Sequence, residues 1–296
     1  MKIFIICFLF PLLATGQKTY TGTIYSYHGE AKIPFATVGL VQENTGTNTD
    51  ENGSFTLLSL QPKRDDTLLI SSVGYESLKI PLNKLPENME FKLLEKQATL
   101  KEVFVHTNKA WSFATLSKFD NCGTFYLSGL HDLTQAAQLI HSDTSNYLLT
   151  EIEICKYSIA IIDPARSIFR IRIYGVDPIS GGPANDLTDS IIEVNTDGRR
   201  IRVNLEKYRI YIPDKDFFVA VEWLKIPYNS SKEHYKINGK RVYYTMYSPL
   251  LCHKNFLQSD PKKSTWPYSV WTKNYKDQWK PMPAVERLMI SAKIKY

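Results

Sequence analysis

The sequence lacks the short motifs that mark the common types of catalytic site. It contains no Gly-x-Ser-x-Gly, no His-Glu-x-x-His and no Gly-x-x-x-x-Gly-Lys. These absences remove the sequence signals of α/β-type serine hydrolases, zinc proteases and P-loop nucleotide-binding proteins. The adjacent residues His141-Ser142-Asp143 do not replace them, because a catalytic triad is assembled from separate segments. We therefore assign no catalytic residue and no cofactor.

An excess of one charge sign is also missing. The 296 residues include 36 Lys plus Arg and 30 Asp plus Glu, for a net charge of only +6. Basic pairs such as Arg199-Arg200 and Lys262-Lys263 are scattered and form no long stripe. A nucleic-acid-binding surface usually has such a stripe, so we expect no nucleic-acid partner.

Long hydrophobic runs are absent except at the start of the chain. Met1-Lys2 precedes an apolar run over residues 3–14, and Thr15-Gly16 follows. This run is shorter than the roughly 20 residues of a spanning helix, and it predicts a signal peptide over 1–16, cleaved after Gly16. Cys7 lies inside the run, which argues against a lipoprotein. We expect an exported mature chain without a transmembrane segment, in the periplasm, at the outer membrane or on the cell surface.

Cysteine is rare in the rest of the chain. Only Cys122, Cys155 and Cys252 follow the leader, and they lack the spacing of metal ligands, so we assign no metal. An oxidising compartment permits one disulfide and one unpaired thiol. We favour three buried free thiols, while the sequence leaves open whether any two of them pair.

Short β-strand patterns fill residues 18–95, with turn signals between them. Alternating or β-rich stretches occur at residues 23–25, 36–41, 54–58, 66–72 and 77–81. Residues 44–53 are polar and end in Asn52-Gly53, the signal of a tight turn. The segment Asp50-x-Asn52-Gly53 has too few oxygen ligands for an EF-hand loop, so it predicts a structural turn.

Four segments of this region carry a family resemblance. They are Gly22-Thr23-Ile24, Pro34-Phe35-Ala36-Thr37-Val38, the stretch from Gly46 to Phe55, and Ser72-Val73-Gly74-Tyr75-Glu76. In this order they resemble the carboxypeptidase-type regulatory-like domain. The resemblance implies a transthyretin-like (prealbumin-like) sandwich of seven strands, common on exported proteins of the Bacteroidetes type. It also implies a non-catalytic add-on module.

Residues 96–111 are interpreted as a linker with a connecting strand, and residues 112–296 as a second, larger domain. Alternation over residues 169–174 and 201–205 predicts half-buried strands. The segments "FRIRIYGVD", "GGPANDL", "VNLEKYRIYIP" and "FFVAVEWL" resemble jelly-roll β-sandwiches of exported Bacteroidetes proteins. The predicted fold class is therefore all-β, with a transthyretin-like sandwich followed by a jelly-roll-like sandwich.

Four local patterns of the second domain lead to further expectations. The spacing of Leu133, Ala136, Ala137 and Ile140 predicts one short helix. Glu151 and Glu153 share one strand face, about 7 Å apart, which could suit a glycosidase pair but is also typical of a solvated face. Trp223, inside an apolar strand pattern, is expected in the core. Cys252-His253 is no nucleophile–base pair, because neighbours on a strand face opposite ways.

The densest aromatic stretch is "STWPYSVWTKNYKDQWKPMP" near the C-terminus. Its aromatic faces could stack on sugar rings or hold peptide side chains, whereas the alternative is that they pin a long loop into the core. The candidate ligand-contact residues are Trp266, Tyr268, Trp271, Tyr275 and Trp279.

These features favour a non-enzymatic, exported, envelope-associated binding or adaptor protein. Its partner would be a glycan or an envelope protein. The alternatives are a hydrolase acting on glycans or peptides, and a purely structural envelope component. The sequence identifies neither the ligand, nor the oligomeric state, nor the side of the outer membrane.

Overall fold

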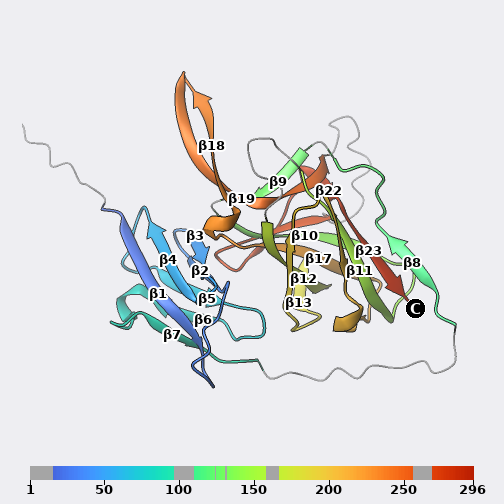
Figure 1. The fold of residues 1–296 in the computed structure, drawn as a ribbon, viewed down its shortest axis with the longest axis horizontal. Coiled ribbons are helices and arrows are strands. Elements are labelled where there is room, and N and C mark those ends of the chain that lie inside the picture. The colour runs from blue at the N-terminus through green and yellow to red at the C-terminus, as the bar shows by residue number, and fades with distance from the viewer. Residues whose placement is uncertain (1–15, 97–109, 124, 131, 158–166, 256–268) are drawn as a thin grey trace, which may run out of the picture.

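The computed structural model describes residues 16–96, 110–123, 125–130, 132–157, 167–255 and 269–296. Within these residues the chain forms strands β1 to β23 and three short 3-10 helices, so the expected all-β class is confirmed (Figure 1). No helix in this part of the chain is long and apolar enough to cross a bilayer. The apolar leader and most of the expected linker lie outside the described residues.

The first seven strands form a small sandwich of two sheets, called here the first sandwich. One sheet has the strand order β4-β1-β7 and the other has the order β3-β2-β5-β6. Apolar side chains between the sheets, including Ile24, Val38, Leu57 and Ile70, form its core. The seven strands implied by the family resemblance are therefore present. They are β1 (Lys18–Ser26), β2 (Thr37–Leu40), β3 (Thr45–Asn48), β4 (Ser54–Ser59), β5 (Thr67–Ser71), β6 (Leu78–Pro81) and β7 (Glu90–Leu93), with η1 (Leu82–Lys84) before β7.

The polar stretch before β4 is part strand and part turn. Asp50 Oδ1 accepts hydrogen bonds from the backbone N–H groups of Asn52 and Ser54, at 2.8 and 2.9 Å. The Asp50 carboxylate therefore holds the predicted structural turn. The polar residues ahead of this turn include a strand that the sequence did not indicate, because Thr45–Asn48 pairs with β2 in an antiparallel ladder.

The later strands form three sheets, called together the second sandwich. One sheet has seven strands, in the order β13-β12-β17-β10-β20-β21 with β14 paired to β12. The next has five, in the order β15-β11-β23-β8 with β16 paired to β11. A four-stranded sheet has the order β18-β19-β22, with β9 paired to β19.

The bounds of these strands are as follows in chain order. The first half comprises β8 (Phe113–Leu116), β9 (Phe125–Gly129), β10 (Leu133–His141), β11 (Tyr147–Cys155), β12 (Ser167–Val176), β13 (Pro183–Asp186), β14 (Ile192–Thr196) and β15 (Arg200–Asn204). The second half comprises β16 (Ile210–Ile212), β17 (Asp216–Trp223), β18 (Ser230–Ile237), β19 (Lys240–Asn255), β20 (Val270–Asn274), β21 (Trp279–Pro281), β22 (Val285–Leu288) and β23 (Ile290–Lys295). The 3-10 helices η2 (Glu206–Tyr208) and η3 (Pro227–Asn229) precede β16 and β18.

The seven-stranded and five-stranded sheets contribute to one main core. Phe169 and Val219 come from the first of these sheets, and Ile152 and Ile290 come from the second. Trp223 is buried at the end of β17, where its indole N–H donates to the Pro249 carbonyl at 2.8 Å. The expectation that Trp223 belongs to the core is confirmed.

The helix expected around Leu133 to Ile140 is wrong, because these residues form strand β10. β10 lies between β17 and β20 inside the seven-stranded sheet, with antiparallel pairing on both edges. Six of its nine residues are buried, and they lie on both faces of the sheet. A strand buried on both faces does not alternate between apolar and polar residues, so a helical spacing can arise in it by composition alone.

Two of the three cysteines are paired. Cys122 and Cys155 form a disulfide with a Cα–Cα distance of 5.7 Å, while Cys252 is a buried free thiol. The favoured expectation of three free thiols is therefore wrong for Cys122 and Cys155. The disulfide closes a segment with a sequence separation of 33 residues, and loops of that size are stabilised by about 3–4 kcal/mol in the chain-entropy picture. It ties the approach to β9 to the end of β11.

Candidate functional site

A polar cleft of about 400 Å³ separates part of the first sandwich from the second. Its wall on the first sandwich comes from β2, β5 and the residues after β5, including Ser71 and Tyr75. Its other wall and its floor come from β10, β12, β13, β17 and β20. A cleft between two rigid sheets is a common place for a ligand site, because both walls are preformed.

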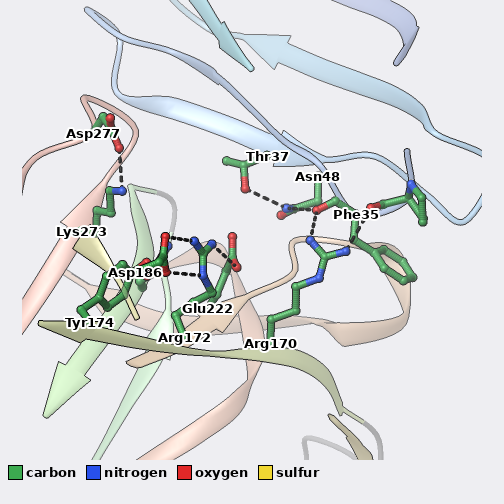
Figure 2. Close-up of polar contacts among 12 residues, drawn as sticks. Phe35, Thr37, Asn48, Arg170, Arg172, Tyr174, Asp186, Glu222, Lys273 and Asp277 are labelled. Carbon is green, nitrogen blue, oxygen red and sulfur yellow. Dashed lines mark hydrogen bonds and ion pairs between the residues drawn. The ribbon is translucent and has the colours of Figure 1, made fainter. Parts of the chain in front are cut away.

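Arg170 of β12 joins the two sandwiches beside the cleft. Its guanidinium donates hydrogen bonds to the backbone carbonyls of Pro34 and Phe35, both at 3.1 Å, and lies 5.7 Å from the Phe35 ring centre (Figure 2). Burial lowers the pKa of Arg170, although Glu222 and Glu193 oppose this effect. Because two carbonyls accept from one buried guanidinium, the approach of the two sandwiches is fixed in direction as well as in distance.

Tyr275, just after β20, forms a second connection. It is only 2% exposed, and its ring lies against Gly39 of β2 and Gly46 of β3, where any Cβ atom would overlap the ring. The Lys225 ammonium lies 4.7 Å from the ring centre, within cation–π range. Burial raises the pKa of the Tyr275 hydroxyl. Tyr275 is therefore a plug in a groove that two glycines leave open.

Asn48, at the end of β3, completes the junction by polar contacts in both directions. Its side-chain oxygen accepts from the backbone N–H of Lys225 at 2.7 Å. Its amide group donates to the Phe35 carbonyl at 3.3 Å and to the Thr37 hydroxyl at 3.2 Å. Next to these bonds, a small apolar cluster contains Phe35 from the first sandwich and Ile168, Leu224 and Ile226 from the second.

The cleft floor carries a compact cluster of charged groups. Arg172 of β12 pairs with Asp186 of β13 at 2.5 Å and with Glu222 of β17 at 3.4 Å, and Figure 2 shows the guanidinium between the two acids. Burial alone would lower the pKa of Arg172, but nearby negative groups, including Glu222 and Asp186, raise it instead. The guanidinium therefore stays charged and holds both carboxylates in place.

An aromatic and amide wall rises beside this cluster. The Tyr174 hydroxyl donates to Gln135 Oε1 at 2.8 Å, and burial raises its pKa above the ordinary value. The Trp279 ring meets the Tyr174 ring edge-on, with 5.4 Å between ring centres. At the rim, Lys273 pairs with Asp277 at 2.6 Å. The cleft thus presents hydrogen-bond donors and hydrogen-bond acceptors beside the half-buried indole of Trp279.

The structure separates the candidate aromatic residues by environment. Trp271 is buried and packs with Ala137 and Phe218, and Tyr275 is buried at the junction between the sandwiches. Trp279 is half-buried and lines the cleft. Trp266 and Tyr268 lie outside the described residues. Of the three described candidates, Trp279 is the half-buried ring at the cleft, with the Lys273 ammonium 5.7 Å from its ring centre, whereas Tyr275 also borders the cleft but is only 2% exposed.

The other residues weighed from the sequence have structural partners. Glu151 pairs with Lys293 at 2.8 Å, and Glu153 lies 3.5 Å from both Arg200 and Arg202. Both carboxylates on this strand face are therefore in ion pairs. His141 is the last residue of β10, and its Nδ1 lies 2.7 Å from Asp216 Oδ1. Within the described ranges, the grouping of potential metal ligands is Cys122, Cys155 and Cys252, and the disulfide uses two of these sulfurs.

Sequence reasoning missed the residues that build the cleft floor. Arg170 and Arg172 alternate with apolar residues, so they look like the solvated face of a half-buried strand. In the structure that face is covered by the first sandwich, and Arg170 is only 2% exposed. A pair of arginines facing a predicted second domain is the one signal that could have indicated the junction.

Comparison with known families identifies the first sandwich. Residues 20–105 match the family described as the CarboxypepD_reg-like domain, and the match confirms the resemblance carried by the four segments. This domain is a non-catalytic β-sandwich module. No curated protein matches the chain.

Proposed function

We propose that this chain is a non-enzymatic, exported component of the cell envelope that binds a glycan in the cleft between its two sandwiches. The observation that carries the proposal is the combination, in one preformed cleft, of the Trp279 ring with the fixed Arg172, Asp186 and Glu222 cluster. The non-catalytic nature of the first sandwich agrees with a binding role.

The chemistry of the cleft wall favours a polyhydroxylated ligand. Sugar hydroxyls both donate and accept hydrogen bonds, and the cleft offers carboxylates, amides, hydroxyls and a guanidinium within one space. The apolar C–H face of a sugar ring packs well on an indole, and Trp279 supplies one. Most drug-like pockets are lined mainly by apolar groups, whereas this lining is mostly polar. The ligand class that fits best is therefore a glycan rather than a lipid or an apolar peptide.

Glycan binding should depend on Trp279. Screening the mature protein on a glycan array should identify ligands, and Trp279→Ala should weaken the best of them at least about tenfold, or about 1.4 kcal/mol. The loss follows from removing the stacking face while leaving the hydrogen-bonding cluster in place. Isothermal titration would measure the change.

Trp111→Ala is the matched control, because Trp111 is an exposed tryptophan that packs on Lys295 and does not line the cleft. This variant should bind like the unmodified protein. Absence of any glycan binding, or equal binding by both variants, would contradict the proposal. Release of reducing sugar from a bound glycan would contradict its non-enzymatic part and favour a hydrolase.

Export is part of the same proposal and has its own test. In a Gram-negative host the mature protein should begin at Gln17, because Ala14 and Gly16 are small residues at the expected cleavage site. The Cys122–Cys155 disulfide supports this expectation, since disulfides persist mainly in oxidising compartments. Gly16→Leu should block processing and leave the leader attached. N-terminal sequencing and intact mass measure both results, and an unprocessed natural chain would refute the expectation.

A further inference from the structure

Strands β18 and β19 form a hairpin that projects from the second sandwich, shown in orange at the top of Figure 1. The two strands pair from Ser230 and Tyr247 out to Ile237 and Lys240. β19 meets β9 only from Tyr247 onward, so within the described chain no third strand flanks the outer part of the hairpin. A two-stranded ribbon of this kind is marginally stable by itself in water. Because no third strand within the described chain flanks the outer part, both of its faces and both of its edges are available for contact.

The strand register gives the outer hairpin two chemically different faces. Because directly opposed residues share a face, the pairs Lys232–Thr245, His234–Tyr243 and Lys236–Arg241 form one side, called here the basic face. The alternate pairs form the other side, called the apolar face, whose apolar members are Tyr235, Ile237, Val242 and Tyr244. The rings of Tyr235 and Tyr244 are in contact, with 5.6 Å between ring centres.

The exposure of these apolar side chains is unusual for a surface that faces only water. On the apolar face, Tyr235 is 49% exposed, Ile237 50% and Val242 36%, and Tyr243 of the basic face is 64% exposed. Towards the base of the hairpin, Tyr244 packs with a buried cluster that contains Met246 and Leu250. The apolar face is thus continuous with the core at one end and open at the other. Contiguous exposed apolar surface of this kind marks a site of interaction.

The charge on the hairpin indicates the kind of surface it would meet. Residues 230–245 contain Lys232, Lys236, Lys240 and Arg241 against the single acid Glu233. No carboxylate within the described ranges forms an ion pair with any of these four cations. Three of the four lie within two residues of the tip, next to Ile237. An unbalanced cationic tip around apolar side chains is complementary to a surface that is both anionic and apolar.

We propose that the β18–β19 hairpin docks tip-first on the surface of an anionic lipid bilayer. Ile237, Tyr235 and Tyr243 enter the boundary between headgroups and acyl chains, where tyrosine is favoured because it has an apolar ring and a polar end. Lys236, Lys240 and Arg241 extend their charges to the lipid phosphates while their stems stay among the apolar groups. A projecting tip suits this contact, because it reaches a flat surface without hindrance from the two sandwiches. The inference goes beyond the proposed glycan binding and does not depend on it.

Co-sedimentation with lipid vesicles tests the docking. The mature protein should partition onto vesicles of phosphatidylglycerol and phosphatidylcholine, and not onto vesicles of phosphatidylcholine alone. The triple variant Lys236→Gln/Lys240→Gln/Arg241→Gln should bind at least tenfold more weakly, and so should Ile237→Ser/Tyr243→Ser. Binding of the unmodified protein should weaken as salt is raised, because the attraction between exposed charges is screened.

The matched control is Lys79→Gln/Lys84→Gln/Lys92→Gln, which removes the same charge from exposed sites on the first sandwich. This control should bind vesicles like the unmodified protein, and unchanged melting temperatures would show that all variants are folded. Equal losses in the control and the hairpin variants would mean non-specific charge attraction and overturn the proposal. So would hairpin variants that bind normally, or a concentration-dependent dimer that the hairpin variants abolish. Glycan binding by the hairpin variants should remain normal, which separates failure here from failure of the cleft proposal.

Discussion

Replacing Tyr275 with Ala should lower the free energy of unfolding by about 3–5 kcal/mol, as for other large aromatic side chains removed from a core. The ring is almost fully buried between Gly39, Gly46 and the Lys225 ammonium. Its loss opens a cavity at the junction between the two sandwiches. Chemical denaturation, followed by intrinsic fluorescence, would measure the change.

Further variants test whether the loss of stability in Tyr275→Ala comes from the contact between the ring and the glycine groove. Tyr275→Phe keeps the ring and removes a buried hydroxyl that has no hydrogen-bond partner within the described residues, so it should be nearly neutral or slightly stabilising. Gly39→Val alone should destabilise, because its side chain meets the Tyr275 ring. Combined with Tyr275→Ala, the same valine should fill the cavity, so the double variant should lose less stability than the two single losses added together. Simple additivity would contradict the described contact.

Replacing Arg172 with Met should also cost about 3–5 kcal/mol, for an electrostatic reason. Asp186 and Glu222 both lie against this guanidinium on the cleft floor. Removing one partner of a buried ion pair leaves charges that neither water nor protein compensates. Thermal and denaturant unfolding of the mature protein measure the loss.

The cluster can be distinguished from an ordinary surface ion pair by two controls. Lys273→Met breaks the Lys273–Asp277 pair, which is more exposed at the cleft rim, and should cost at most about 1 kcal/mol. The triple variant Arg172→Met/Asp186→Asn/Glu222→Gln removes the charges together and should recover much of the stability lost by Arg172→Met. A small effect of Arg172→Met, equal to that of Lys273→Met, would show that the floor is solvated.

The first sandwich was largely predictable because short polar and glycine-containing segments mark the turns between its strands. The spacing of β-rich segments predicted strands at the positions of β1, β2, β4, β5 and β6, and Asn52-Gly53 predicted the turn that precedes β4. Strand β3 was not predictable in this way, because Thr45–Asn48 is polar and glycine-containing and forms an edge strand that pairs with β2. The composition of a segment gives no information about a neighbouring strand.

The second sandwich shows where periodicity fails. β10 is buried on both faces and therefore lost the alternation that identifies a strand, so its apolar residues fitted a helix. The cleft was harder still, because its floor combines Arg172, Asp186 and Glu222 from three separate strands. Alternation predicted that Arg172 lies opposite the core, but a sequence pattern does not say which other surface covers it.

The aromatic stretch illustrates the same limit at the level of single residues. Trp271, Tyr275 and Trp279 look equivalent in the sequence, yet one packs inside the second sandwich, one plugs the junction and one faces the cleft. Trp271 and Trp279 lie on the same face of the seven-stranded sheet, because Lys273 pairs with Trp279 and lies two residues from Trp271. They differ in burial, since Trp271 is 6% exposed whereas Trp279 is half-buried and borders the cleft. The sequence pattern does not give this difference in burial.

The groove formed by Gly39 and Gly46 also limits how this chain could have been assembled from parts. Here Tyr275 of the second sandwich inserts into the first sandwich, and Arg170 donates hydrogen bonds to two backbone carbonyls of the first sandwich. A donor module with side chains at the two glycine positions would not seat, however well it folded. The two sandwiches are therefore matched at this contact, because a side chain at position 39 or 46 would overlap the Tyr275 ring.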